Sequence, residues 1–268
     1  MAPARMMTGR KGVIMGVAND HSIAWGIART LAAHGADLAF TYQGGSLEKR
    51  VRPLAEQTGS SVVVQCDVEE DASIVGAFGA VADAMGSIDF VVHAIAYSDK
   101  EELSGHYVDT TRTNFRRTMD VSCFSFTATA KAALPLMTNG GSLLTLTFSG
   151  SERVVPNYNV MGVAKAALEA SVRYLAADLG EHGIRVNALS AGPVRTLAGS
   201  AVAGARHTFR WAQTHAPLKR NADLDDLGGA ALYLLSDLSN GVSGEVHHVD
   251  GGYHVVGIPH PDRLNNEP

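Results

Sequence analysis

The feature that most constrains this chain is a repeated order of short apolar runs and helical stretches. The first apolar run is GVIMGVA, residues 12–18, and the helical stretches that follow often stop at a glycine, such as Gly35, Gly59 or Gly86. Glycine readily takes the left-handed conformation that closes a helix. Apolar strands that alternate with helices predict a parallel sheet covered by helices on both faces.

These predicted elements follow one another without a linker or repeat. Further strands are expected at residues 37–42, 61–66, 90–94, 142–146, 185–189 and 245–249, and helices at residues 23–34, 47–58, 72–85, 111–137, 159–181 and 224–236. We therefore predict an α/β fold: a single doubly wound Rossmann-type domain over residues 1–268, with a seven-stranded parallel sheet and loose tails at 1–8 and 256–268. The weakly patterned segment 191–213 is either a mobile lid or a substrate loop, and we take residues 194–213 as the substrate loop.

Composition excludes several functional classes. The net charge of -5 and the lack of a basic run argue against nucleic acid. No apolar run approaches the length of a membrane span, and the start of the chain is unlike a signal peptide. The two cysteines, Cys66 and Cys123, and the eleven histidines show no metal-ligand spacing. We expect a cytoplasmic protein without a metal.

Ligands of open parallel sheets bind beyond the carboxyl ends of the strands, so those positions carry the functional signal. After the first strand, Gly16 and Ala18 permit close approach of the backbone, and a helix that starts near Ser22 offers free N–H groups to a pyrophosphate. This turn is not a GxGxxG motif. Packing is an equal alternative for it, and Ser22 could be a plain N-cap.

Other strand ends also carry small or polar residues. Gln43 stands where an NAD-binding fold often has an acid for the ribose hydroxyl, and no arginine follows it to accept a 2′-phosphate, which favours NAD. Asp67 could accept from an adenine amino group or cap the next helix. Thr196, after a sharp Gly-Pro bend, could bond a cofactor amide or phosphate. Together these ends indicate a dinucleotide site.

Tyr158 and Lys165 stand seven residues apart in a stretch that becomes strongly helical after Pro156. Such a step returns to nearly the same helix face, so the phenol and the ammonium are expected to share one space. A nearby ammonium lowers the pKa of tyrosine from about 10, which suits the phenol to proton donation. A surface tyrosine and a solvated lysine are the alternative, and the strand ends weigh against it.

The order of these motifs resembles the short-chain dehydrogenase/reductase superfamily and, within it, the bacterial NADH-dependent type I enoyl-acyl-carrier-protein reductases. The resemblance runs from about residue 9 to 253 and is most specific in GVANDHSIAWGIA, PNYNVMGVAKAALEASVRYLA and RVNALSAGPVRTLA. Ordinary members of the superfamily place the tyrosine four residues before the lysine, where this chain has Met161. The spacing from Tyr158 to Lys165 is the enoyl reductase pattern.

The resemblance implies NADH-dependent reduction of the trans-2 double bond of enoyl thioesters on acyl-carrier protein, in bacterial fatty acid elongation. Tyr158 would stabilise the enolate oxygen and Lys165 would hold the nicotinamide ribose. The implied cofactor contacts are Gly16, Ser22, Ile23, Gln43, Asp67, Val68, Ile95, Lys165, Val194, Arg195, Thr196, Leu197 and Ala198, and the implied substrate contacts are Ser98, Tyr158 and Met161. The helices at 111–137 and 159–181 would pack between the subunits of a homotetramer, or they only cover the sheet.

Two residues depart from the family pattern. Phe148 stands where the family usually has a second tyrosine, and Ala96 stands where it usually has glycine beside the nicotinamide. If the missing hydroxyl were an oxyanion donor, its loss would lower the rate by about 10²–10³; if it only shaped the pocket, the effect would be small. The alternatives are therefore a respecialised paralogue that reduces another alkene or a carbonyl, and a weakly catalytic dinucleotide-binding protein.

Overall fold

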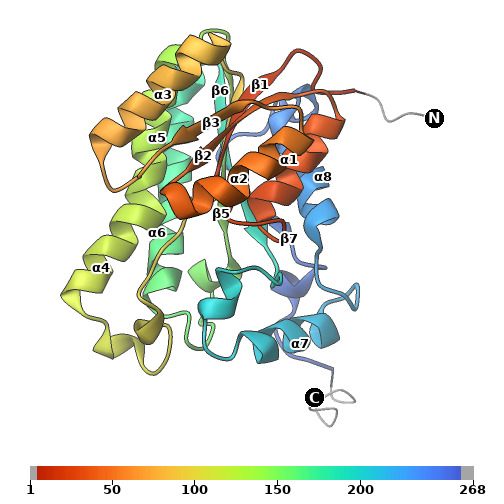
Figure 1. Cartoon of the computed structure of the whole chain (residues 1–268). Coiled ribbons are helices and arrows are strands. Elements are labelled where there is room, and N and C mark those ends of the chain that lie inside the picture. The colour runs from red at the N-terminus through yellow and green to blue at the C-terminus, as the bar shows by residue number, and fades with distance from the viewer. Residues whose placement is uncertain (1–4, 261–268) are drawn as a thin grey trace.

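The computed structural model describes residues 5–260, in which the predicted alternation forms one sheet. Its seven strands are all parallel and lie in the order β3-β2-β1-β4-β5-β6-β7 (Figure 1), which confirms the predicted doubly wound Rossmann-type fold. The strands are β1 (Lys11–Met15), β2 (Asp37–Tyr42), β3 (Val62–Gln65), β4 (Phe90–His93), β5 (Gly141–Thr147), β6 (Ile184–Ala191) and β7 (Val246–Val249).

The strand order reverses at β1, which pairs with β2 on one side and β4 on the other. Gly12 is thus opposite both Leu38 and Phe90. A side chain at Gly12 would collide with the Phe90 ring, because a Cβ built there lies 2.1 Å from Phe90 Cε2. The crevice beyond such a reversal is where dinucleotides bind in folds of this type.

Two layers of helices cover the sheet (Figure 1). The helices are α1 (Ile23–Ala33), α2 (Gly45–Gln57), α3 (Asp71–Met85), α4 (Arg112–Met119), α5 (Ser125–Ala133), α6 (Val160–Leu179), α7 (Ala205–His215) and α8 (Leu224–Leu235). One core lies between the sheet and α1, α2 and α8, and includes Trp25, Leu31 and Leu227. A second core lies under α3, α5 and α6 and includes Phe126 and Leu168. None of the helices within residues 5–260 is both long and apolar enough to cross a membrane.

The long helix predicted for residues 111–137 is interrupted. Between α4 and α5 the chain makes a π-helical turn over Asp120–Phe124. Ser122, in this turn, accepts a hydrogen bond from the backbone N–H of Tyr97 at 2.9 Å and donates to the carbonyl oxygen of the same residue at 3.0 Å. The π turn therefore fixes the loop that follows β4, which is the type of role that such turns have at functional sites.

The helix predicted for residues 159–181 is confirmed as α6, which begins at Val160 and not directly after Pro156. Two further segments differ from what the sequence suggests. The weakly patterned substrate loop contains α7, whose Ala212 is buried. The loose arm expected at residues 1–8 is wrong for Met7, which is fully buried and bonds from its backbone N–H to the carbonyl oxygen of His34 at 3.0 Å. Residues 1–4 and 261–268 lie outside the described part of the chain.

Candidate active site

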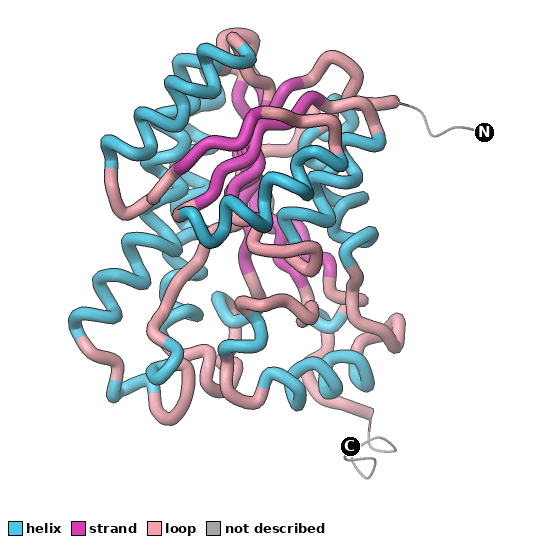
Figure 2. The backbone as a smooth tube through the Cα atoms, viewed as in Figure 1, coloured by secondary structure: helices cyan, strands magenta, loops and turns pink. Residues whose placement is uncertain are grey.

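Loops and short helices, α7 among them, gather at the end of the molecule to which the strand arrows of Figure 1 point, and the loops are pink in the same view in Figure 2. The first of these loops leaves β1 at Gly16, which has φ +98°. A Cβ at this position would lie 2.1 Å from the carbonyl oxygen of Ala94, at the end of β4. Only glycine permits this close approach of two backbone segments, which agrees with the packing alternative for this turn, and the contact of Gly16 with a cofactor stays a prediction.

Ser22 stands at the N-cap position of α1 but makes no capping hydrogen bond. Its Oγ instead accepts from the backbone N–H groups of Ala18 at 3.0 Å and Asn19 at 3.1 Å. Ser22 is thus the N-cap residue, as the alternative predicted, but its hydroxyl shapes the turn between β1 and α1 and does not cap the helix. The helix that starts at Ile23 has no acidic residue in its first turn, so its N-terminus suits an anionic group.

Gln43 and Asp67, predicted from the ends of β2 and β3, are brought together. The Gln43 Nε2 donates to Asp67 Oδ2 at 3.2 Å. The other oxygen, Oδ1, accepts from the backbone N–H of Glu69 at 3.1 Å. Helix α3 has Glu70 at its N-cap, so Asp67 does not cap it and the capping alternative is wrong. Val68, between these groups, is buried.

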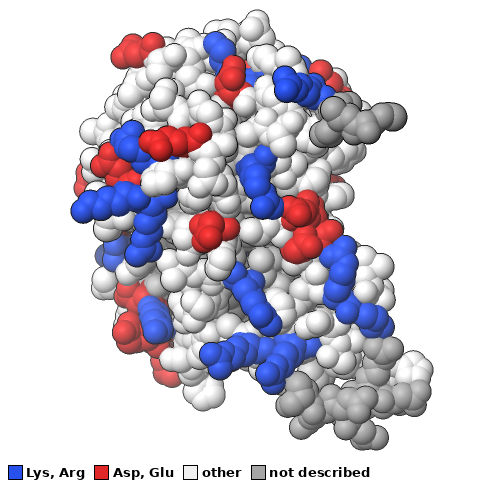
Figure 3. Space-filling view, turned by 45° about the vertical axis from the view of Figure 1, so that its right-hand side comes forward, with Lys and Arg blue, Asp and Glu red and all other residues white. Residues whose placement is uncertain are grey.

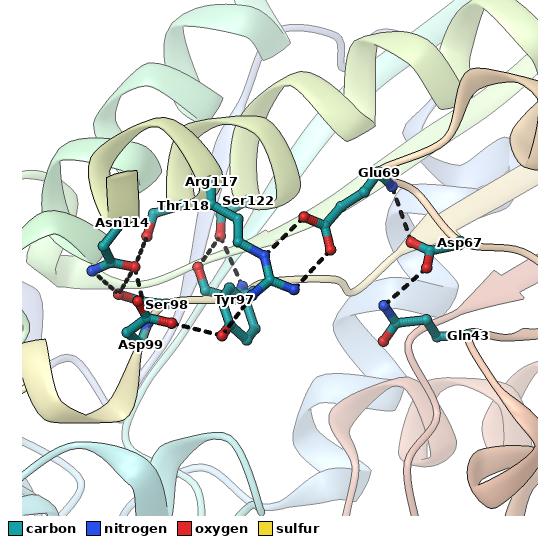
Figure 4. A network of polar contacts seen from close by, with 10 residues as sticks. All are labelled: Gln43, Asp67, Glu69, Tyr97, Ser98, Asp99, Asn114, Arg117, Thr118 and Ser122. Carbon is teal, nitrogen blue, oxygen red and sulfur yellow. Dashed lines mark hydrogen bonds and ion pairs between the residues drawn. The ribbon is translucent and has the colours of Figure 1, made fainter. Parts of the chain in front are cut away.

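An ionic network joins this edge to the loop after β4 (Figure 4). Arg117 of α4 donates from Nε and Nη2 to the Glu69 carboxylate at 2.8 and 2.9 Å, and from Nη1 to the Tyr97 hydroxyl at 2.9 Å. Its guanidinium lies 4.1 Å from the centre of the Tyr97 ring, and Tyr97 donates to Asp99 at 2.7 Å. Sequence reasoning missed Arg117, because its partners are distant in the chain.

The loop after β4 contains the next predicted contacts. Ile95 packs against the second core, and Ala96 is exposed, as a residue lining an open site would be. The Ser98 hydroxyl accepts from Asn114 Nδ2 at 3.0 Å. Met161, predicted to contact substrate, is only 6% exposed, and its sulfur lies 3.8 Å from Ser122 Oγ. Ser98 is therefore half-buried in the loop after β4, whereas Met161 is buried below that loop, next to Ser122.

The end of β5 gathers the predicted catalytic residues. The rings of Phe148 and Tyr158 meet edge to face, with centroids 5.1 Å apart at an interplanar angle of 70°. Gly150 allows this arrangement, because a Cβ there would lie 2.4 Å from Tyr158 Cδ1. Lys165, only 5% exposed, donates from Nζ to the carbonyl oxygen of Leu146 at 2.7 Å.

The electrostatics of this group differ from the sequence prediction. Burial lowers the pKa of Lys165 from its ordinary value of 10.5 to about 8, against the opposing effects of Cys123 and Glu169. Burial, assisted by the Glu169 carboxylate, raises the pKa of Tyr158. The predicted fall in the pKa of Tyr158 is therefore wrong, because burial of the phenol raises it. Glu169 is itself buried and accepts from Thr147 Oγ1 at 2.5 Å.

The helix-face argument for the pair also fails in its details. Tyr158 precedes α6, in a turn closed by hydrogen bonds from its N–H to the Val155 carbonyl at 3.1 Å and from the Met161 N–H to its own carbonyl at 3.0 Å. Lys165 lies within α6. Both residues nevertheless reach the end of β5, because Tyr158 packs on Phe148 and Lys165 bonds to Leu146.

The predicted contacts after β6 begin the substrate loop. The Thr196 N–H bonds to the Val194 carbonyl at 2.9 Å, and the Thr196 Oγ1 accepts from the Gly199 N–H at 3.0 Å. Arg195 places its guanidinium 4.6 Å from the centre of the Phe209 ring, on α7. Leu197 and Ala198 follow, with Leu197 54% exposed. Within residues 5–260, no group of His, Cys, Asp and Glu could hold a metal ion.

A parallel sheet in this order, with a glycine turn after β1 and a tyrosine and a lysine at the end of β5, defines an oxidoreductase of the short-chain dehydrogenase/reductase type. The family described as enoyl-(acyl carrier protein) reductase matches residues 16–254. The chain belongs to this family.

Relatives and solved structures agree with this assignment. An NADH enoyl-acyl-carrier-protein reductase 2 of Rhizobium meliloti is 61% identical, with 95% of each chain covered. A crystal structure of the reductase from Anaplasma phagocytophilum in complex with NAD is 58% identical, with a TM-score of 0.93 over 97% of this chain and 99% of that one. The Bacillus cereus enzyme, solved with NADP+ and indole naphthyridinone, is 50% identical, with a TM-score of 0.93 over 94% of this chain and 99% of that one.

Proposed function

We propose that this chain reduces the trans-2 double bond of enoyl thioesters on acyl-carrier protein with NADH, in bacterial fatty acid elongation, and that Tyr158 and Lys165 are its catalytic residues. One observation carries the assignment of residues: the buried Lys165 bonds to the Leu146 carbonyl and Tyr158 packs on Phe148, so both stand at the carboxyl end of β5. The family membership of the chain supports the reaction.

The residues of the crevice fit NADH. Gly16 lets the turn after β1 pack closely on the end of β4 at Ala94, and the start of α1 at Ile23 suits the pyrophosphate. Gln43 and Asp67 present an amide and a carboxylate where the adenosine end would lie, while Ile95 and residues 194–198 would border the nicotinamide end. When bound, NADH supplies the hydride for the β-carbon of the substrate.

Tyr158 acts as a hydrogen-bond donor to the thioester oxygen. As the β-carbon is reduced, negative charge develops on that oxygen, and a fixed donor stabilises it most where water is scarce. The raised pKa of Tyr158 keeps the phenol protonated at neutral pH, which preserves the donor. The residue therefore does not need the lowered pKa that its neighbour Lys165 suggested from the sequence.

Lys165 holds the ribose hydroxyls. An ammonium has three N–H donors, and one of these is used by the Leu146 carbonyl. This bond directs Nζ along the end of β5 and leaves two donors for hydroxyl groups. Burial lowers the pKa of Lys165, so its proton is easier to release than that of an exposed lysine.

The carrier protein and the assembly belong to the same proposal. Basic side chains gather along the lower part of one face of the molecule (Figure 3). At that end α7 carries Arg206 and Arg210, both exposed, which suit an acidic carrier approaching the substrate loop. We propose that α4, the π turn and α6, on which Phe115, Phe124 and Val163 are exposed, lie at the interfaces of the homotetramer that the family resemblance implies. We propose a cytoplasmic location.

The test is NADH oxidation with enoyl-acyl-carrier-protein substrates of several chain lengths. We expect turnover by the wild type and a loss of about 10²–10³ in kcat for Tyr158→Phe, with NADH binding unchanged. Tyr174→Phe is the matched control, because Tyr174 lies on α6 and is 76% exposed. Turnover of ketones or enones without turnover of any enoyl thioester would overturn the proposed substrate.

A further inference from the structure

The two residues that flank Tyr158 have unusual backbone conformations. Within residues 5–260, the non-glycine residues with positive φ are Asn157 at 65°, Asn159 at 43° and Lys219 at 58°. Asn159 combines its positive φ with a ψ of -124°. Asparagine tolerates positive φ better than most residues, but this conformation still costs free energy. Two of these three positive-φ residues, Asn157 and Asn159, therefore form the turn that carries the Tyr158 side chain.

Asn159 uses its side chain on the loop after β4. Its Nδ2 donates to the carbonyl oxygens of Glu102 at 3.0 Å and Ser104 at 3.3 Å. Glu102 is anchored in turn, because its carboxylate accepts from Thr111 Oγ1 at 2.6 Å and from Asn114 Nδ2 at 3.0 Å. Asn114 also bonds to Ser98, as Figure 4 shows. The position of Tyr158 is thus tied to the start of α4 and to the predicted substrate contact Ser98.

Asn157 uses its side chain on the substrate loop. Its Nδ2 donates to the carbonyl oxygen of Ala203 at 3.0 Å. The N–H of Ala203 bonds to the carbonyl of Leu103 at 3.1 Å, so the substrate loop also contacts the loop after β4. A closed set of contacts results, in which the turn around Tyr158, the loop after β4 and the substrate loop each bond to the other two.

We propose that Asn157 and Asn159 are positioning residues for Tyr158, which rests on the proposed function of that residue. Asn159 fixes the phenol against the loop after β4. Asn157 links the phenol to the substrate loop, so that seating of the acyl chain under this loop and alignment of the hydroxyl with the thioester oxygen occur together. Neither asparagine touches the reacting atoms, and both act through Tyr158.

The simpler explanation is that both residues only permit a tight turn. Glycine would then serve equally well, because it takes positive φ without strain. The side-chain bonds argue otherwise. Both amides reach carbonyl groups in distant segments, 46 residues away for Asn157 and 57 residues away for the Glu102 contact of Asn159. An asparagine needed only for its backbone would have no need of these partners.

The distinguishing variant is Asn159→Gly, which keeps the backbone conformation and removes the amide. We expect kcat for enoyl reduction to fall at least about tenfold, with the KM for NADH within about twofold of the wild type. Asn159→Asp is the second variant, because aspartate also tolerates positive φ but presents an oxygen to both carbonyls. It is expected to lose at least as much turnover. Wild-type kcat in both variants would overturn the proposal for Asn159.

Coupling to the phenol separates positioning from a general structural role. In a Tyr158→Phe background, Asn159→Gly should lower kcat by less than about twofold, because the hydroxyl on which it acts is gone. An equal loss in both backgrounds would refute positioning. If Tyr158→Phe itself has wild-type turnover, the proposed function of Tyr158 fails. If only Tyr158→Phe is impaired, the inference about Asn159 fails alone.

The role of Asn157 predicts a change in the KM for the substrate. Asn157→Gly should raise the KM for the enoyl-acyl-carrier-protein at least about threefold and leave the KM for NADH unchanged, because the lost bond seats the substrate loop. An unchanged substrate KM would refute this link. Asn139→Gly is the control for both positions: Asn139 is exposed and precedes β5, at the opposite end of the sheet, so all kinetic constants should stay at wild-type values.

Discussion

Phe148 packs edge to face against Tyr158, with ring centroids 5.1 Å apart. Phe148 is one of the two residues, with Ala96, that depart from the pattern implied by the family resemblance, which has a second tyrosine here. Edge-to-face pairs contribute about 0.5–1.5 kcal/mol beyond their buried area. The ring of Phe148 therefore helps to hold the phenol, whether or not a hydroxyl is present on it.

From this contact we predict that Phe148→Tyr changes kcat by less than about tenfold, because the ring that supports Tyr158 is retained. Phe148→Ala should lower kcat by about tenfold, the factor that corresponds to about 1.4 kcal/mol of lost support. Steady-state NADH oxidation with an enoyl-acyl-carrier-protein measures both. A gain of a hundredfold or so in Phe148→Tyr would show that the missing hydroxyl was an oxyanion donor.

The lowered pKa of Lys165 predicts a pH dependence. The ammonium is present below pH 8 and is lost as the pH rises through about 8, well before the ordinary lysine value of 10.5. Because kcat/KM for NADH reports on the free enzyme, we expect it to decline above about pH 8.

Lys165→Arg is the matching variant for this profile, because a guanidinium stays charged throughout the range. Its kcat/KM should be lower overall and should show no decline near pH 8. A wild-type profile that remains flat to pH 10 would contradict the assigned role of the ammonium.

Gly16 and Gly79 predict opposite effects of the same substitution. Gly16→Ala places a Cβ 2.1 Å from the Ala94 carbonyl oxygen at φ +98°, so the free energy of unfolding should fall by about 3 kcal/mol and NADH binding should be lost. Gly79 is an exposed position inside α3 with nothing within 4 Å of its Cβ, so Gly79→Ala should raise that free energy by about 0.5–1 kcal/mol. Urea denaturation measures both. Equal effects would show that the glycine turn is not a constraint.

The fold and the meeting of Gln43 with Asp67 could be predicted because they depend on local patterns. Apolar strands, glycine stops and polar strand ends are visible in sequence, and Gln43 and Asp67 do meet as the parallel order of β2 and β3 requires. The pKa of Tyr158 could not be predicted, because the spacing between Tyr158 and Lys165 does not show that Tyr158 is buried. Nor does it show that the Lys165 ammonium bonds to the Leu146 carbonyl.

The side-chain contacts of Asn157 and Asn159 also could not be predicted from the sequence. Asn157 and Asn159 could be seen beside Tyr158, but their partners lie in loops whose paths depend on the whole sheet. Arg117 bonds to Glu69 across 48 residues, with only Arg116 beside it as a weak signal of charge. The sequence contains no local pattern that joins such pairs, so only the folded chain reveals them.

The Gln43–Asp67 pair predicts the choice between NADH and NADPH. A 2′-phosphate near Gln43 would add negative charge close to the Asp67 carboxylate, which lies 3.2 Å from the Gln43 amide nitrogen. We expect the wild type to favour NADH, and Asp67→Asn to shift the ratio of kcat/KM values towards NADPH by about tenfold, equivalent to about 1.4 kcal/mol. Asp71→Asn removes the same charge from the exposed first turn of α3 and should leave the ratio unchanged. If both variants shift the ratio equally, net charge and not the Gln43–Asp67 pair sets the preference.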